Sequence, residues 1–405
     1  MNPLAGTLNA EETQAMLGAV LREVHGADAL LADWSACPVS KRGKHRTLRY
    51  DLDARIAGEP VIRRYQWVGK FYEQDEDARR VAWGLRELAA TDCGVRGGLV
   101  LPGVVAYHAP CRLLLLTYES GASVIRAIAQ HGALVLQAIG RALAALHTTP
   151  LGLESAISPS SLLDGLRTKL ALFGARFPGH TEALRTTLDK LEYRKPTAPA
   201  TLSAVHGDLG PSQLLWQTGR LVVLDLDTCA RGDPALDLGN LLTQLRRLTL
   251  RKPGKLPEFA SLRQTILDSY QRWSPSYPDL DERVAWYEQI TLVRKIRFLA
   301  TDTLRHKGAE AMRQRRAEAI RLLRELPDRR TLLRLSNSRH AVHRGAPLRR
   351  RPPRFERRLR RRREDAGRRV QRTLSDRARM EVLGFAERVH GDALWRRQGR
   401  RRGEL

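Results

Sequence analysis

The chain has 405 residues, of which 42% are hydrophobic, enough for a globular protein of two or three domains. Its four cysteines lie far apart and form no Cys-x-x-Cys or Cys/His cluster, which argues against a disulfide framework and against a zinc site. The N-terminus lacks a signal-peptide pattern, and no segment has the roughly 20 apolar residues that span a bilayer. We therefore expect a soluble, cytoplasmic protein.

The net charge of +26 is unevenly distributed along the chain. Residues 339–405 contain 23 arginines and 8 acidic residues, so this tail carries +15 of the total. Dense runs of like charge are usually solvated, and we expect residues 336–405 to be largely disordered. Binding to nucleic acid or to another acidic partner is expected only through this tail, which contains no recognisable nucleic-acid-binding module.

The N-terminal part predicts a small sheet with one helix laid across it. Alternating and apolar patterns bounded by turn residues predict strands. The expected strands cover 46–52, within a hairpin over 38–57, and 61–72, 99–105 and 112–118. A helix is expected over 76–90, where Val81, Leu85 and Leu88 recur at helical spacing.

Beyond residue 121 the pattern changes to long amphipathic helices. The expected helices cover 134–148, 161–173, 181–191, 259–273, 280–304 and 310–326. One further strand is expected over 220–226. The change from strand patterns to helix patterns falls near residues 119–123. We expect an N-terminal lobe over 1–120 and a helical lobe over 121–335.

The most informative stretch is His-Gly-Asp-Leu-Gly-Pro-Ser-Gln at residues 206–213. Phosphoryl transfer needs positioning and charge neutralisation rather than covalent help from the protein. Asp208, a short acid in an irregular loop, is suited to orienting an acceptor hydroxyl. Asp225 interrupts an apolar strand, where an unpaired charge is costly, so a metal ion or an ionic partner is expected. We assign Mg²⁺ to Asp225 and Gln213, and expect the neighbouring Asp227 to be either a ligand or a salt-bridge residue.

Candidate phosphate-binding groups precede this stretch. Lys70 ends the strand expected over 61–72, where a lysine could reach the phosphates of ATP; a plain surface charge is the alternative. The turn formed by Lys41, Arg42, Gly43 and Lys44 could lie over the phosphates, although it has neither Walker nor Gly-x-Gly-x-x-Gly spacing. An acid on the following helix should pair with Lys70. Glu76 is favoured over Glu87.

Other polar residues around the motif are interpreted as structural. His206 is expected to form a hydrogen bond that holds the loop, without a chemical step. Asp233 precedes Pro234 and is expected to cap a helix, and Asp237 is expected to brace the loop. A second His-Gly-Asp, at residues 390–392, is followed by neither the amide nor the second acid, and we interpret it as a chance match.

Together these segments resemble the aminoglycoside phosphotransferase and choline kinase family, small-molecule relatives of the protein kinases. The likeness covers roughly residues 35–325 and includes the hinge-like segment 114–119. It implies a bilobal α+β protein-kinase-like fold, with a small antiparallel N-terminal sheet and a mostly helical C-terminal lobe. It also implies that Asp208 is the catalytic base, that Asp225 binds magnesium, that Lys70 binds the phosphates, and that Tyr118 and Glu119 lie at the nucleotide.

One position departs from the family pattern, because Gln213 stands where the family normally has Asn. The longer side chain moves the amide oxygen by one methylene, and Mg²⁺ distances near 2.1 Å tolerate little displacement. The leading hypothesis is an ATP- and Mg²⁺-dependent kinase that phosphorylates a hydroxyl of a small molecule. The alternative is a nucleotide-binding pseudokinase whose basic tail docks on nucleic acid or an acidic partner.

The acceptor is not identified by the sequence. A sugar, an amino alcohol or an aminoglycoside would each suit the hydroxyl chemistry. Aminoglycosides call for an acidic cleft, and the candidate acids in the helical lobe are Asp279, Asp281, Glu282 and Glu288.

Overall fold

The computed structural model describes residues 8–39, 46–197, 202–277, 279–301 and 309–324, which all belong to one compact unit, Met1–Pro327. The basic turn at 41–44, the tail over 336–405 and the second His-Gly-Asp lie outside the described residues. None of the described helices is long and apolar enough to span a membrane.

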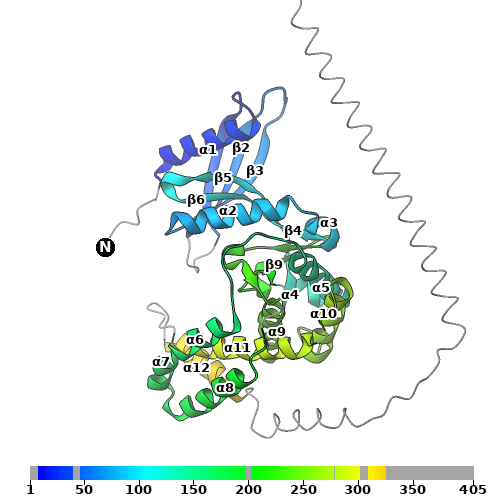
Figure 1. The fold of residues 1–405 in the computed structure, drawn as a ribbon. Helices are drawn as coiled ribbons and strands as arrows, with labels where there is room; N and C mark the ends of the chain where they lie inside the picture. The colour runs from blue at the N-terminus through cyan, green and yellow to red at the C-terminus, as the bar shows by residue number, and fades with distance from the viewer. Residues whose placement is uncertain (1–7, 40–45, 198–201, 278, 302–308, 325–405) are drawn as a thin grey trace, which may run out of the picture. The chain divides into compact units, whose positions relative to one another are not determined.

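The N-terminal part contains an antiparallel five-stranded sheet in the order β1-β2-β3-β6-β5 (Figure 1). Its strands are β1 (Leu30–Pro38), β2 (Arg46–Arg55), β3 (Arg63–Phe71), β5 (Val104–His108) and β6 (Leu113–Thr117). The predicted hairpin over 38–57 corresponds to β2 and its partner β1, which lies further N-terminal than predicted. Helix α1 (Ala10–His25) begins with a capping box between Asn9 and Glu12.

The four leucines of β6 are all buried, because the sheet is covered on both faces. Leu113 and Leu115 belong to the core shared with α1, which also contains Leu17, Tyr50 and Trp67. Leu114 and Leu116 point to the opposite face, since successive side chains on a strand alternate. There they join the larger core together with Leu85 and Leu88 of α2 (Asp75–Ala89), the predicted helix.

The strand predicted over 99–105 is two strands that belong to different sheets, so this prediction was wrong. β4 (Leu99–Val100) pairs in parallel with β10 (Arg220–Val223), whereas β5 begins at Val104 in the first sheet. Pro102 and Gly103 lie between them and contribute to neither strand. The second sheet has the order β4-β10-β9-β7, with β9 at Leu214–Gln217 and β7 at Ala122–Ser123.

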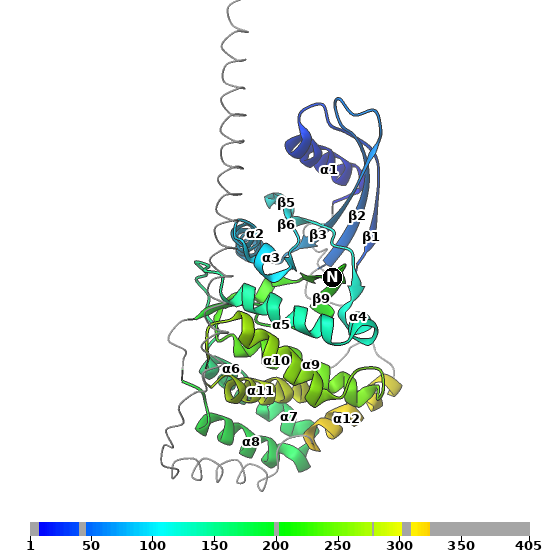
Figure 2. The ribbon, with the colours of Figure 1, turned by 90° about the vertical axis from the view of Figure 1, so that its right-hand side faces the viewer.

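The rest of the described chain is mostly helical (Figure 2). Its helices are α3 (Cys93–Gly97), α4 (Val124–His131), α5 (Ala133–His147), α6 (Pro159–Arg167), α7 (Leu170–Arg176), α8 (Thr181–Tyr193), α9 (Ala235–Arg251), α10 (Phe259–Trp273), α11 (Leu280–Thr301) and α12 (Ala309–Arg324). The helix predicted over 161–173 is divided into α6 and α7 at Thr168 and Lys169. The helix predicted over 259–273 is α10 without change.

Helices α5 and α10 pack at very short range along one side of the helical part. A Cβ atom at Gly140 would lie 2.6 Å from the carbonyl oxygen of Ile266 and 2.7 Å from the backbone nitrogen of Tyr270. Only glycine therefore allows this approach, and the apolar stripe of α5 is buried against α10 as a result.

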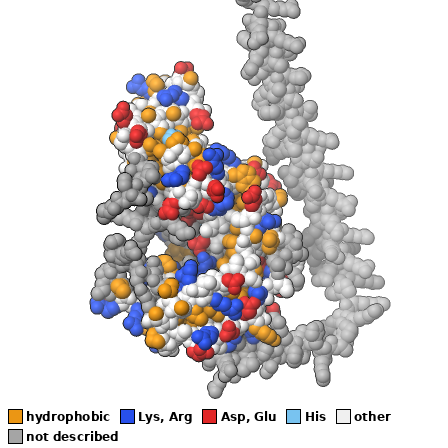
Figure 3. All heavy atoms as spheres, turned by 60° about the vertical axis from the view of Figure 1, so that its left-hand side comes forward, with side chains coloured by type: hydrophobic (Ala, Val, Ile, Leu, Met, Phe, Trp, Pro, Cys, Tyr) orange, Lys and Arg blue, Asp and Glu red, His pale blue; other side chains and the backbone are white. Residues whose placement is uncertain are grey.

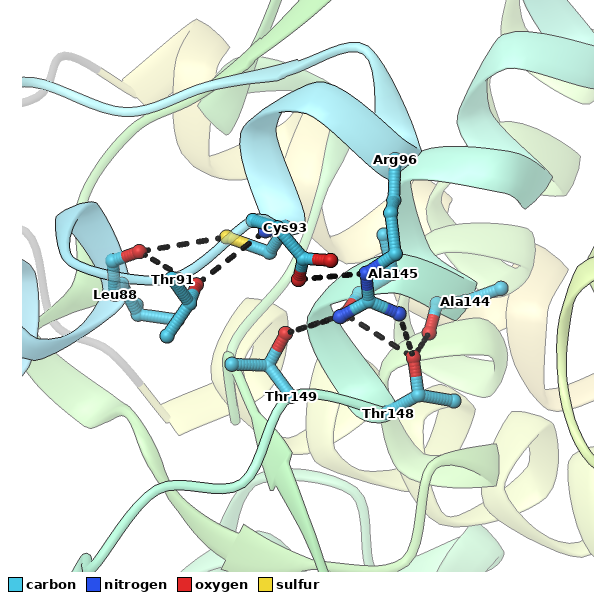
Figure 4. A network of polar contacts seen from close by, with 9 residues as sticks. Leu88, Thr91, Cys93, Arg96, Ala144, Ala145, Thr148 and Thr149 are labelled. Carbon is cyan, nitrogen blue, oxygen red and sulfur yellow. Dashed lines mark hydrogen bonds and ion pairs between the residues drawn. The ribbon is translucent and has the colours of Figure 1, made fainter. Parts of the chain in front are cut away.

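A polar network joins α3 to the end of α5 (Figure 4). The Arg96 guanidinium donates to Thr148 Oγ1 at 3.2 Å and to Thr149 Oγ1 at 3.3 Å, while its Nε bonds Asp92 Oδ1 at 2.7 Å. The Thr149 hydroxyl in turn donates to the Ala145 carbonyl. These contacts attach α3 to the helical part rather than to the five-stranded sheet.

Candidate active site

The loop with the His-Gly-Asp sequence follows β8 (Ser203–Val205), which pairs with β11 (Ala230–Gly232). Residues 203–210 are buried with one exception, Asp208, whose side chain is 65% exposed. The sequence therefore places one carboxylate at the surface of an otherwise buried loop. That is the geometry that a residue needs in order to meet a substrate from solution.

Asp237 at the start of α9 holds the backbone of this loop. Its carboxylate, fully buried, accepts hydrogen bonds from the backbone N–H of His206 at 2.6 Å and of Gly207 at 2.9 Å, and contacts His147 Nε2 at 3.0 Å. Burial alone would raise the pKa of Asp237, but the hydrogen bonds and charges of His147 and His206 hold that pKa below its usual range. Asp237 is thus an ionised brace, as expected.

Further bonds fix the loop to its surroundings. Asn240 Nδ2 donates to the Gly207 carbonyl at 3.1 Å, and its Oδ1 accepts from the Thr291 hydroxyl at 2.6 Å. His206 Nε2 lies 2.9 Å from the Leu224 carbonyl, one residue before Asp225. Gly207 has a φ of +84°, and a Cβ atom there would lie 2.5 Å from the Thr228 carbonyl oxygen. These contacts hold the loop against the second acidic segment.

The sequence predicted that Asp225 interrupts an apolar strand, and this prediction was wrong. β10 ends at Val223, and Asp225 follows in the left-handed region with φ 66° and ψ 53°, its side chain 50% exposed. A left-handed conformation is uncommon for a residue other than glycine and is tolerated by Asp. It turns the chain away from the sheet, so that the carboxylate is available at the surface instead of being buried without a partner.

Lys70 at the end of β3 lies between two carboxylates of this segment. Its Nζ is 2.6 Å from Asp225 Oδ1 and 2.5 Å from Asp227 Oδ2, although the residues are more than 150 positions apart in sequence. Glu76, the acid favoured from sequence, is exposed in the first turn of α2. The structure thus pairs Lys70 with the motif acids, and the pairing with Glu76 stays a prediction.

Asp227 is held by two further residues that sequence reasoning did not identify. The Tyr72 hydroxyl donates to Asp227 Oδ1 at 2.9 Å, and Arg80 Nη1 donates to the Asp227 carbonyl at 2.9 Å. Burial and the negative charge of Asp227 raise the pKa of Tyr72, which remains a neutral donor. Tyr72 follows Lys70 by two residues on the same face of its strand, which is the sequence signal that could have identified it.

Gln213 lies opposite Leu224, the residue before Asp225, where β9 pairs with β10. Its backbone carbonyl accepts from the Leu224 N–H at 2.8 Å, and its side-chain Oε1 accepts from the Ser212 hydroxyl at 3.0 Å. Amide and carboxylate oxygens are suitable Mg²⁺ ligands. Within the described residues, no group of three or more His, Cys, Asp and Glu side chains could hold a metal ion. Gln213 and Asp225 stay the predicted magnesium ligands.

The hinge-like segment lies at the end of β6. The Tyr118 backbone N–H bonds the Gln66 carbonyl at 3.0 Å, and the Arg49 guanidinium lies 5.5 Å from the Tyr118 ring centre. Glu119 Oε1 accepts from the Thr117 hydroxyl at 2.8 Å. These residues lie at the same end of β3 and β6 as Gln66.

Asp233 was predicted to be the N-cap of α9, but the N-cap is Pro234, and Asp233 lies one residue before it and bonds the first helical residue. Its Oδ1 accepts from the Ala235 N–H at 3.0 Å, and its Oδ2 contacts Arg283 Nη2 at 2.5 Å in a buried ion pair. This pair joins the start of α9 to α11, so it supports the helix that carries Asp237 and Asn240.

Comparisons with known proteins agree with this geometry. A family model described as "Phosphotransferase enzyme family" matches residues 57–287, more than half of the chain. Curated protein sequences give no match.

Solved structures show the same fold at low identity. A thermostable mutant of aminoglycoside phosphotransferase APH(4)-Ia, in complex with ADP and hygromycin B, has a TM-score of 0.51 at 14% identity, covering 76% of this chain and 98% of that one. Amicoumacin kinase hAmiN, with AMP-PNP, Ca²⁺ and Ami, has a TM-score of 0.51 at 13% identity, covering 78% and 94%. Choline kinase from Cryptosporidium parvum Iowa II has a TM-score of 0.50 at 12% identity, covering 78% and 96%. The predicted α+β protein-kinase-like fold is confirmed.

Proposed function

Because the chain belongs to the phosphotransferase enzyme family, we propose that it is an ATP- and Mg²⁺-dependent kinase that phosphorylates a hydroxyl of a small molecule. The observation that carries this proposal is the position of Asp208, an exposed carboxylate on a braced and otherwise buried loop. Lys70 and Asp225, the other charged groups that the reaction needs, contact each other at 2.6 Å.

In the proposed reaction, Asp208 orients the acceptor hydroxyl and accepts its proton. The hydroxyl oxygen forms a bond to the γ-phosphorus of ATP, and the bond from that phosphorus to the oxygen bridging to the β-phosphate breaks, which releases ADP. Asp208 is suited to this role because the Asp237 hydrogen bonds fix its loop before substrate arrives.

Lys70 is proposed to bind the phosphates of ATP. Tyr118 and Glu119 are proposed to lie at the adenine base of ATP. The ammonium group of Lys70 already lies between the carboxylates of Asp225 and Asp227. When ATP binds, a phosphate oxygen would take the place of one of these carboxylates beside the ammonium group. Asp225 and Gln213 would hold Mg²⁺, which neutralises charge on the β- and γ-phosphates when it is bound.

The proposal is tested with the conservative variant Asp208→Asn. The variant keeps the size of the side chain but loses the proton acceptor, and we expect turnover to fall by about 10²–10⁴-fold. AMP-PNP binding, measured by calorimetry, should be unchanged. ADP release is measured over a panel of sugars, amino alcohols and aminoglycosides. Asp164→Asn, at an exposed position on α6, is the matched control.

Two outcomes would contradict the proposal. Wild-type turnover in Asp208→Asn would remove the assigned role of Asp208. Tight AMP-PNP binding without ADP release on any acceptor would favour the nucleotide-binding pseudokinase instead.

A further inference from the structure

Three of the four acids considered for a polycationic acceptor, Asp279, Asp281 and Glu288, are paired with arginines. Asp281 is in the first turn of α11, thirteen residues before Arg294, which places it about 20 Å away along the helix axis. Its carboxylate contacts Arg263 Nη1 at 2.7 Å, and Glu288 contacts the same guanidinium at 3.3 Å. Asp279 contacts Arg283 at 3.3 Å. These acids are therefore engaged with arginines of the helical core.

Two basic residues of α11 lie near Asp208. Arg294 Nη2, on α11, lies 3.6 Å from Asp208 Oδ1. Its neighbour Lys295 is close enough for the charge of Asp208 to act on it, and its Nζ lies 4.8 Å from the Phe298 ring centre. On the face drawn in Figure 3, acidic and basic side chains are mixed over the described surface.

Helix α9 contributes a further arginine, Arg247, whose charge acts on Lys295. The Gln244 side chain lies 3.7 Å from the position a Cβ atom would take at Gly210, two residues after Asp208. Arg247, one turn further along α9, donates to Gln244 Oε1 at 2.6 Å and pairs with Glu318 of α12. Arg247 is thus neutralised by an acid, whereas the carboxylate facing Arg294 is that of Asp208 itself.

We propose that the acceptor carries an anionic group, a carboxylate or a phosphate, a few bonds from its reacting hydroxyl, and that Arg294 binds this group with the help of Lys295. This inference rests on the proposed kinase function. An acceptor hydroxyl must lie about 2.6–3.2 Å from Asp208, and a guanidinium 3.6 Å from the same carboxylate is then within reach of the substituents beside that hydroxyl. Arg is suited to this task because its planar donors match carboxylate and phosphate oxygens.

Burial supports the part assigned to Lys295. Desolvation and the charge of Arg247 lower the pKa of Lys295 to about 8, against the opposing effects of Glu318 and Asp208; Arg315 acts in the same direction as Arg247. An ammonium group in such surroundings gains more from an incoming anion than an exposed one does. Anion affinity should therefore fall as pH rises from 7 to 9, while Arg294 keeps its charge.

The kinetic test compares acceptors that share one sugar ring and carry different charges at C2 or C6. Glucose, glucosamine, glucuronate and glucose 6-phosphate are offered with ATP and Mg²⁺, and every active compound of the wider panel is compared with its charged and neutral analogues in the same way. We expect the anionic member to have the highest kcat/KM. Arg294→Gln should raise its KM at least tenfold and leave the KM for ATP unchanged. The carboxylate and phosphate members show which anion the site prefers.

A binding test does not depend on turnover. The full-length protein is saturated with AMP-PNP and Mg²⁺, and sodium sulfate is titrated at constant ionic strength. Arg294→Gln should weaken sulfate binding at least tenfold relative to Arg185→Gln, an exposed arginine of α8. Arg294→Lys, which keeps the charge, should retain binding within about threefold and shows that loss in the Gln variant is not due to misfolding.

The two tests separate the inference from the function on which it rests. Weakened sulfate binding without turnover on any acceptor would retain the anion site and reject the kinase. Preferred turnover of cationic acceptors, or sulfate binding that is the same in Arg294→Gln and Arg185→Gln, would overturn the anionic acceptor and leave the kinase assignment intact.

Discussion

Replacing Asp237 with Asn tests whether a buried carboxylate holds the catalytic loop. Asp237 accepts from two backbone N–H groups and contacts His147, all within 3.0 Å. The amide oxygen of Asn can accept two of these bonds, but its NH₂ group then faces the third donor. We expect the variant to fold with lower stability and with a loop that no longer positions Asp208.

The size of the effect follows from the bonds that change. A hydrogen bond to a charged acceptor contributes about 1 kcal/mol more than one to a neutral acceptor, and an unsatisfied buried donor costs about 1–3 kcal/mol. Two weakened bonds and one lost bond give a decrease of about 3–5 kcal/mol in the free energy of unfolding. This is a large share of a typical total of about 5–15 kcal/mol.

The measurement is urea unfolding followed by circular dichroism, together with kcat under saturating substrate. Asp189→Asn, an exposed acid of α8, is the control and should change stability by no more than about 0.5 kcal/mol. Because the folded-state pKa of Asp237 is depressed, its stabilisation is present above the unfolded pKa near 3.9 and is lost as pH falls through the folded pKa. The difference between wild type and variant should therefore shrink below about pH 4. An Asp237→Asn protein as stable as wild type at pH 7 would refute the reasoning.

Three further substitutions test other parts of the structure. Lys70→Met should lower kcat/KM for ATP at least tenfold, since a charge-assisted bond contributes about 1.5–3 kcal/mol. An unchanged affinity for AMP-PNP, measured by calorimetry, would contradict this prediction. Gln213→Asn should lower the Mg²⁺ concentration for half-maximal activity, and an unaltered Mg²⁺ titration would remove Gln213 from the ligand set. Gly140→Ala should destabilise the protein by at least about 2 kcal/mol in thermal unfolding because its Cβ would overlap α10. Gly165→Ala, with no atom within 4 Å of its Cβ, should be neutral or stabilising.

The sequence predicted the helices of the fold better than its sheets. α10 begins and ends where its apolar stripe does, because helical hydrogen bonds and periodicity are local. Leu99 and Val100 formed one apolar run with Val104 and Val105, yet the first pair joins β10 and the second joins β6. The pairing of β4 with β10 depends on residues more than a hundred positions away, and no local pattern encodes it.

The same limit applies to the candidate site. Asp208 and Asp225 were recognisable because acids stand out in apolar or glycine-rich surroundings. The contacts of Lys70 with Asp225 and Asp227, and of Tyr72 with Asp227, join β3 to the segment after β10. The left-handed conformation of Asp225, which exposes its carboxylate, also has no sequence signature. The sequence thus identified the candidate acids and Lys70, but it did not predict which side chains they contact.

The position of β4 has a consequence for motion between the five-stranded sheet and the helical part. Since β4 pairs with β10 and Arg96 attaches α3 to α5, the chain passes between the two parts at 90–92, 101–103 and 118–121. A lobe on a single linker can swing and twist freely, whereas several separate connections restrict movement to a rotation about a line near them. We therefore expect the five-stranded sheet to move relative to the helical part by a small rotation about a fixed axis near these three connections.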